Sequence, residues 1–171
     1  MRASDILDFW FADGMQRQWF RATPALDAQI RERFSAAWRL GTNGELDHWA
    51  TTPDGALALV ILLDQFPLNM FRGQAASFAS ESKAIAITKA AISRQFDRQL
   101  PRDRLAFLYM PLMHSEDLED QERSVALYEA AGLDDNLRFA RHHRDLIRRF
   151  GRFPHRNAIL GRSSSLEELD Y

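Results

Sequence analysis

The sequence predicts a single all-α domain over residues 1–171, folded as an antiparallel array of helices. Two pairs, Thr23-Pro24 and Thr52-Pro53, have the form of an N-cap followed by proline at the first helical position. Apolar residues recur at helical spacing, and no segment offers a strand-like partner for another. The chain has no linker or low-complexity stretch, and its 46% apolar and 27% charged residues suit one core.

The first long helix is predicted to begin at Pro24. Its apolar residues recur at every fourth position and form one stripe, which consists of Leu26, Ile30, Phe34 and Trp38. Gly41 follows the stripe and is predicted to end the helix, because glycine favours the left-handed backbone of a C-terminal cap.

The most apolar segment, residues 57–63, follows the second start signal. Periodicity alone would also allow a buried strand, but the preceding start signal favours a central, fully buried helix. Pro67 is predicted to block or kink this helix, because proline has no N–H to donate to the carbonyl of Leu63.

The second half of the chain predicts a series of shorter helices. Acidic residues crowd the first turns after Ser115, which suits the positive end of a helix dipole. The expected elements are 81–96, 103–113 with Pro111 disturbing its end, a helix capped by Ser115 and ended by Gly132, 135–150 stopped by Gly151, and short turns after Pro154 and near Ser165.

The composition excludes several classes of function. A net charge of -2 argues against a chain-wide nucleic-acid surface, so we expect no nucleic-acid partner. The absence of cysteine removes disulfides, thiolate nucleophiles and cysteine-based zinc sites, and it is compatible with a reducing cytoplasm. Asp5 and Asp8 argue against a signal peptide, and the longest apolar run, 56–63, falls short of the ~20 residues of a membrane helix. We therefore expect a cytoplasmic protein that does not enter the membrane.

Two polar residues, Asp64 and Gln65, directly follow the most apolar run. An unpaired buried carboxylate is costly, so Asp64 is expected to reach solvent or to have a partner. One interpretation is that Asp64 caps a helix or pairs with an arginine. The other is that it points into a pocket.

His143 is expected to face the core, whereas its neighbour His142 is expected to be solvated. A histidine in such a place either makes one satisfying hydrogen bond or has a function near neutral pH. On a helical wheel its neighbours are Phe139, Ala140, Leu146, Ile147 and Phe150.

No motif predicts a metal site or a cofactor. His114-Ser115-Glu116 has the spacing His-x-Glu, but the zinc deaminase signature also requires two cysteines. Phosphate loops, dinucleotide turns and nucleophile elbows are absent. Distant ligands could still converge on a metal ion, and the candidates are His114, Glu116, His143 and His155, but their spacing gives this no support.

Residues 148–162 form a basic segment without an acid in a protein that is net negative. Its arginines could pair structurally with the acidic run 116–122, clamp an anionic ligand through two-donor guanidinium groups, or bind RNA or DNA with Phe150 and Phe153 stacked on bases. The basic residues are Arg148, Arg149, Arg152, Arg156 and Arg162, with His155 beside them.

A shared family pattern runs through Ile6–Phe11, Trp19-Phe20, Leu62–Pro67, Met110-Pro111, His114–Asp117, Gln121, His143, Phe150–Asn157 and Leu160–Arg162. In these segments, which span essentially the whole chain, the sequence resembles the bacterial domain of unknown function 924 family. The resemblance implies a tetratricopeptide-like helical fold and no particular activity. The family usually has arginine where this chain has Leu68, so a contact made there by relatives would differ, and the chain ends slightly early, at Tyr171.

We expect the flagged polar residues to converge on one site, because most of them lie at helix ends or proline breaks, where pockets form. The favoured hypothesis is a helical binding module for an anionic small molecule or an acidic peptide end. The predicted ligand-binding residues are Gln65, Arg152, His155, Arg156, Asn157 and Arg162.

Two alternatives stay open. A hydrolase-like enzyme would use His114 or His143 as general base, oriented by Glu116 or Asp64. A scaffold for a protein partner would instead bury the polar residues in a closed structural network. The sequence identifies neither the ligand nor the oligomeric state.

Overall fold

The computed structural model describes residues 1–21 and 23–171, and every regular element in these ranges is helical, which confirms the all-α prediction. The α-helices are α1 (Ala3–Trp10), α2 (Pro24–Thr42), α3 (Pro53–Val60), α4 (Phe66–Met70), α5 (Glu81–Ser93), α6 (Arg102–His114), α7 (Leu118–Ala130), α8 (Asp134–Phe150) and α9 (Leu166–Leu169). Short 3-10 turns cover Met15–Arg17, Asp47–Thr51, Ala75–Phe78, Asp97–Gln99 and Pro154–Arg156, and a π turn covers Ile61–Gln65.

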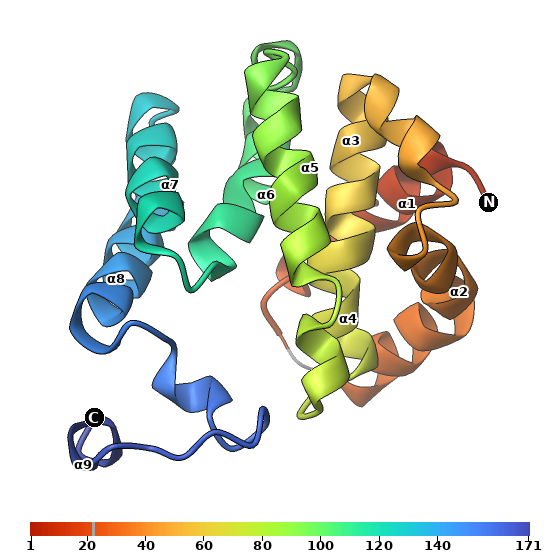
Figure 1. The fold of residues 1–171 in the computed structure, drawn as a ribbon. Coiled ribbons are helices and arrows are strands. Elements are labelled where there is room, and N and C mark those ends of the chain that lie inside the picture. The colour runs from red at the N-terminus through yellow and green to blue at the C-terminus, as the bar shows by residue number, and fades with distance from the viewer. Residues whose placement is uncertain (22) are drawn as a thin grey trace.

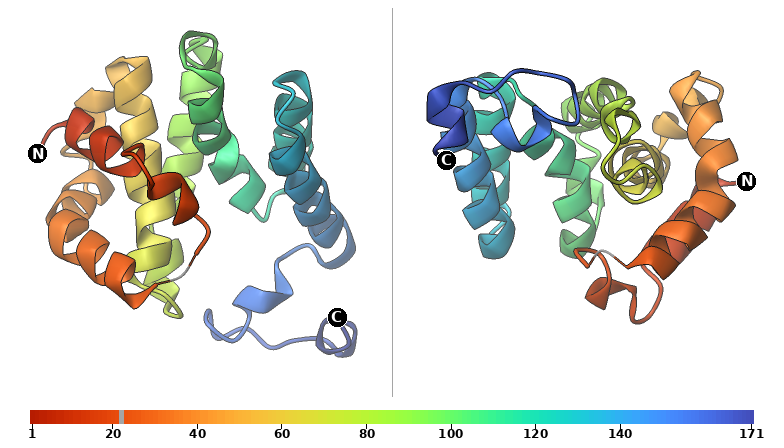
Figure 2. Two further views of the ribbon diagram at one scale, coloured as in Figure 1. Left: turned by 180° about the vertical axis from the view of Figure 1, so that it is seen from behind. Right: turned by 90° about the horizontal axis from the view of Figure 1, so that it is seen from below.

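Consecutive helices run in alternating directions along most of the chain (Figure 1). Helix α5 packs against α3 and α6, and α7 packs against α6 and α8. Helices α1 and α2 cover the N-terminal side of α3 and α4, and the two termini lie at opposite ends of the array (Figure 2). The antiparallel array is therefore confirmed, whereas tetratricopeptide-like stays a prediction.

Both sequence start signals are confirmed by their cap hydrogen bonds. The hydroxyl of Thr23 accepts from the amide of Leu26 at 3.2 Å, and that of Thr52 accepts from Gly55 at 3.1 Å. Each threonine therefore satisfies one of the amides that a helix start leaves without a partner.

The prediction that Gly41 ends α2 is wrong, because the helix continues to Thr42. Gly41 is buried, and a Cβ atom at this position would lie 3.3 Å from the side chains of both Leu62 and Leu63. The glycine therefore lets α2 approach the central helix closely instead of turning the chain.

The central helix of the molecule runs from α3 through the π turn into α4, and residues 55–67 are all buried. The prediction that Pro67 blocks this helix is wrong, because helical backbone continues to Met70. Pro67 occupies the first turn of α4, where its missing N–H is tolerated. The helix widens into the π turn just before the proline. The carbonyl of Leu63 accepts instead from the hydroxyl of Ser80 at 2.6 Å, so the expected gap in the backbone bonding is filled from outside the helix.

Two helix ends differ from the expected ones around residue 115. Helix α6 continues through Pro111 to His114. The cap of α7 is Asp117, whose carboxylate accepts from Asp120 N at 3.1 Å, and Ser115 instead accepts from Asp117 N and donates to the Asp120 carboxylate. The predicted cap, Ser115, lies two residues before the observed one, Asp117, because serine and aspartate are both common N-cap residues.

The last part of the chain is a segment of turns, residues 151–165, that leaves α8 at Gly151 and returns towards α4 and α5 before α9 (Figure 1). Gly151 has φ 69°, the left-handed conformation expected of a helix end. Phe153 packs with Leu146 and Ile147 of α8 in a small apolar cluster separate from the main core. In the described part of the chain, no helix combines the length and apolar character needed to cross a membrane.

Candidate functional site

His114, the last residue of α6, lies where three adjoining clefts meet. The amide cleft, of about 210 Å³, is lined by Trp19, Phe20, Arg21, Gln65, Leu68, Asn69, Arg72, Met110 and His114. The apolar cleft, of about 480 Å³, is lined by Phe20, Met110, Met113, His114, Asp135, Asn136, Phe139 and His143. The histidine cleft, of about 210 Å³, is lined by Leu68, Phe78, His114, His143, Phe153, His155 and Arg156.

Asp64 holds the imidazole of His114 in place. The Nδ1 atom of His114 lies 2.9 Å from Oδ1 of Asp64, whose side chain is only 2% exposed. Gln65 donates from Nε2 to the other carboxylate oxygen of Asp64 at 2.6 Å. Both Asp64 and Gln65 belong to the π turn, a type of helix distortion that occurs often at functional sites. The central helix thus supplies the carboxylate that contacts His114 at the end of α6.

The Asp64–His114 pair favours a protonated imidazole. Burial alone would lower the pKa of His114, but the charge and hydrogen bond of Asp64, together with the charge of Glu81, raise it above the ordinary 6.5. With Nδ1 engaged by Asp64, Nε2 is the ring atom left for a ligand, and no hydrogen bond within the described residues involves it.

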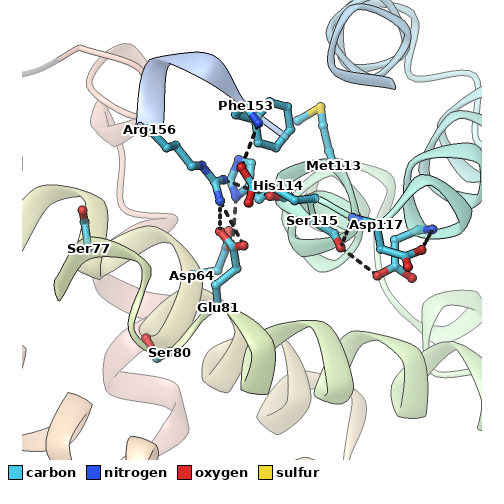
Figure 3. Close-up of polar contacts among 12 residues, drawn as sticks. Asp64, Ser77, Ser80, Glu81, Met113, His114, Ser115, Asp117, Phe153 and Arg156 are labelled. Carbon is cyan, nitrogen blue, oxygen red and sulfur yellow. Dashed lines mark hydrogen bonds and ion pairs between the residues drawn. The ribbon is translucent and has the colours of Figure 1, made fainter. Parts of the chain in front are cut away.

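Arg156 connects the C-terminal segment to this pair. Its guanidinium contacts the Glu81 carboxylate at 3.0 Å and donates to the backbone carbonyl of His114 at 2.9 Å. It also lies between the rings of Phe78 and Phe153, with 4.3 and 4.7 Å to their centroids. Figure 3 places Asp64, His114, Glu81 and Arg156 around one point. Burial raises the pKa of Glu81, and Arg156 only partly offsets this.

Glu116, Arg162 and Asn157 come together in a second cluster, which lines none of the three clefts. Arg162 binds both oxygens of Glu116, at 2.7 and 2.8 Å, and donates from Nε to Asn157 at 3.0 Å. Glu116 also accepts from the amide of Phe153 at 2.8 Å. Burial would raise the pKa of Glu116, but Arg162 and this amide hold it below its usual value. The imidazole of His114 is therefore oriented by Asp64 and not by Glu116.

Arg152 lies in a third cluster, further along the same segment. It contacts both oxygens of Glu168, at 2.7 and 2.8 Å, and these hydrogen bonds hold the pKa of Glu168 at about 2. The remaining arginines of the basic segment, Arg148 and Arg149, pair with Glu122 and Glu167. Each arginine between 148 and 162 thus faces a carboxylate of the protein, and two of these carboxylates belong to the acidic run 116–122.

His143 faces the clefts, so the prediction that it faces the core is wrong. The side chain is half-buried in the wall of the apolar and histidine clefts, and its neighbour Phe139 is 52% exposed. Nδ1 of His143 lies 2.8 Å from the carbonyl of Phe139. Burial, with further contributions from nearby histidines, lowers the pKa of His143 to about 4, so this imidazole is neutral at neutral pH. His142 is exposed, as expected.

The clefts present positive groups and keep the matching carboxylates behind them. Arg21, Arg72 and His114 line the amide cleft, and Arg156 lines the histidine cleft with three histidines. Within the described part of the chain, no carboxylate lines either cleft. The partners of these cations, which lie outside both linings, are Asp27 for Arg72, Asp64 for His114 and Glu81 for Arg156.

Sequence reasoning missed Glu81 and the cleft residues Arg21, Arg72 and Met113. Glu81 stands in the first turn of a helix, where an acidic residue is ordinary, so nothing marked it as the partner of an arginine 75 positions away. Among the described residues, no three histidines or carboxylates lie close enough together to hold a metal ion, and the four considered residues do not form such a group.

Comparisons with known proteins place the chain in a family without assigning a function. The family described as bacterial protein of unknown function (DUF924) matches residues 6–171. The solved structure of the protein of unknown function ATU0120 from Agrobacterium tumefaciens is 41% identical, with a TM-score of 0.93 over 99% of this chain and 95% of that chain. None of the curated proteins matches.

Proposed function

We propose, for a chain that belongs to the bacterial DUF924 family of proteins of unknown function, that it binds a small anionic molecule at His114. The observation that carries the proposal is the Asp64–His114 pair at the junction of three clefts. Asp64 keeps the imidazole protonated and fixes its orientation, so that Nε2 donates to the ligand. Clefts of a few hundred cubic ångströms suit a small molecule better than an acidic peptide end.

The charges around the clefts support an anion. Positive side chains line the amide and histidine clefts, while their carboxylate partners lie behind them. The pKa of His155 is lowered first by burial and then by Arg156, as expected where the local potential is positive.

The proposal places the anion at His114 and not on Arg152 or Arg162. Each of these arginines already binds both oxygens of a glutamate. A ligand there would have to compete with a carboxylate whose pKa is depressed, and such a carboxylate is a strong competitor for a guanidinium. Among the predicted ligand-binding residues, Gln65, His155 and Arg156 keep a place in the proposed site because they line the clefts.

An NMR titration with propionate tests the proposal. We expect chemical-shift changes in residues lining the amide cleft, with saturation in the millimolar range typical of fragments. His114→Asn is the diagnostic variant, because the asparagine amide takes the place of Nδ1 beside Asp64 while nothing replaces Nε2. It is expected to weaken binding at least tenfold. His142→Asn is the matched control, because His142 is exposed and lies outside the clefts.

The pH dependence gives a second readout of the same proposal. Since the pKa of His114 is raised, binding should persist through pH 6.5 and decline as the pH rises through the raised value. Binding that is equal in His114→Asn and in the parent protein, or that does not depend on pH, would refute the proposal.

A second function is favoured by one specific feature, the contact of Asp64 with Nδ1 of His114. A carboxylate on Nδ1 is the arrangement that orients histidine for proton transfer at Nε2 in many hydrolases. Turnover of p-nitrophenyl butyrate or p-nitrophenyl phosphate that disappears in His114→Asn would establish an enzyme. Binding of propionate without any turnover would leave the binding function alone. We place either activity in the cytoplasm, with which the absence of cysteine is compatible.

A further inference from the structure

Two exposed phenylalanines mark the apolar cleft. Phe20 is 73% exposed and Phe139 is 52% exposed, whereas the other described phenylalanines are buried or half-buried. They come from opposite ends of the chain, and both line this cleft. Large apolar side chains gathered on one exposed surface often mark a binding site, because exposure to water is otherwise unfavourable.

The rest of this cleft is also suited to an apolar chain. Met110 and Met113 stand about one turn apart on α6 and both line the cleft, and flexible methionines adapt to ligands of varied shape. The neighbouring His143 is neutral because its pKa is about 4. The one carboxylate in the lining, Asp135, is 91% exposed and contacts Arg138 at 3.5 Å, so its charge is solvated and paired.

The apolar cleft adjoins the amide cleft and shares lining residues with it. Phe20, Met110 and His114 line both the apolar cleft and the amide cleft. A single small molecule can therefore place a charged group at His114 and an apolar chain between Phe20 and Phe139.

The charged group is better matched by a monoanion than by a dianion. Arg72 in the amide cleft already binds both oxygens of Asp27 through Nε and Nη2, at 2.8 and 2.9 Å, so this carboxylate offsets its charge. His114 lies at the C-terminal end of α6, where the helix dipole is negative and a second negative charge is disfavoured. The other polar side chains of this cleft are Arg21, which is exposed to solvent, and the neutral amides of Gln65 and Asn69.

We propose that the ligand is an amphipathic monocarboxylate, such as a medium-chain fatty acid, with its carboxylate at His114 and its chain in the apolar cleft. This inference rests on the proposed function and adds the class of molecule to it. The cleft volume of about 480 Å³ is within the range of small-molecule sites.

The test is isothermal titration calorimetry of the full chain with propionate, octanoate, octan-1-ol and octyl phosphate. Each buried methylene raises affinity about fourfold, so octanoate should bind on the order of 100-fold more tightly than propionate even if part of the chain stays hydrated. Octanoate should also bind at least tenfold more tightly than octan-1-ol and octyl phosphate.

Phe139→Ala tests the contribution of the apolar cleft separately from that of the carboxylate contact at His114. Because Phe139 is exposed and does not line the amide cleft, the variant should fold and keep its affinity for propionate. It should lose most of the difference in affinity between octanoate and propionate. Leu40→Ala is the matched control, because Leu40 is similarly exposed at 39% and lines none of the three clefts.

The outcomes distinguish this inference from the proposed function. Equal affinities for propionate and octanoate, with binding still lost in His114→Asn, would overturn the inference and leave the proposed function intact. Equal affinities for octanoate and octan-1-ol would overturn both, because the carboxylate would not matter. Tighter binding of octyl phosphate would overturn the choice of a monocarboxylate, and no binding of any probe would overturn both.

Discussion

Replacing His143 with phenylalanine should make the folded state less sensitive to acid. In the folded protein the pKa of His143 is about 4, because burial disfavours the charged imidazole, while the unfolded chain has the ordinary 6.5. Since the folded pKa is depressed, this histidine contributes stability that is fully present above pH 6.5 and is lost as the pH falls towards 4. Phenylalanine has no such titration.

The size of the effect follows from the two pKa values. At pH 5 the unfolded chain binds a proton at this position and the folded protein does not. This difference lowers the free energy of unfolding by about 2 kcal/mol relative to pH 7. Phenylalanine keeps an aromatic ring against Phe153, whose centroid lies 5.3 Å from that of His143. The hydrogen bond to the Phe139 carbonyl is lost at both pH values and cancels in the comparison.

Urea unfolding of the parent protein and of His143→Phe at pH 7 and pH 5 measures the effect. The quantity of interest is how much more stability the parent loses on acidification than the variant, because contributions from other groups cancel to first order. We expect a difference of about 2 kcal/mol. Equal losses in the two proteins, or an NMR titration of His143 near pH 6.5, would refute the reasoning.

Three other substitutions probe the site and the fold. Asp64→Asn should lower the pKa of His114 below its ordinary value, since burial remains while the carboxylate is removed, and NMR titration of the imidazole measures this. Arg156→Met should lower the free energy of unfolding by about 3 kcal/mol, because it leaves the Glu81 carboxylate without its buried partner. Urea unfolding should also find Gly55→Ala destabilised by at least about 2 kcal/mol, because the new Cβ would lie 1.9 Å from a backbone carbonyl oxygen.

Controls exist within the chain for these variants. Arg149→Met removes an ion pair with Glu167 in which both side chains are more than half exposed, and it should cost less than about 1 kcal/mol. If Arg156→Met lowers the free energy of unfolding no more than Arg149→Met does, burial of the Arg156–Glu81 pair does not matter for stability. An unchanged pKa of His114 in Asp64→Asn would mean that the imidazole is not held by Asp64.

Local chemistry determined the helices of this protein and many of their ends. The hydroxyls of Thr23 and Thr52 cap helices that begin at the following prolines, and Gly132 and Gly151 adopt the left-handed backbone expected after a helix. The sequence also indicated that the carbonyl of Leu63 would lose its usual donor. These features depend on interactions within one or two turns of chain, so they can be predicted from sequence.

The partners of the polar side chains were decided only by the tertiary structure. His114 and Asp64 lie 50 positions apart, and Arg156 and Glu81 lie 75 apart, so their pairing depends on which helix ends meet. The sequence identified Asp64 as a carboxylate in need of a partner. The interpretation that this partner is an arginine was wrong, because Asp64 contacts the imidazole of His114. For His143 the helical wheel gave the correct face, but that face borders a cleft at the edge of the array. Periodicity determines which residues share a side of a helix, and packing of distant helices determines whether that side meets protein, a ligand or water.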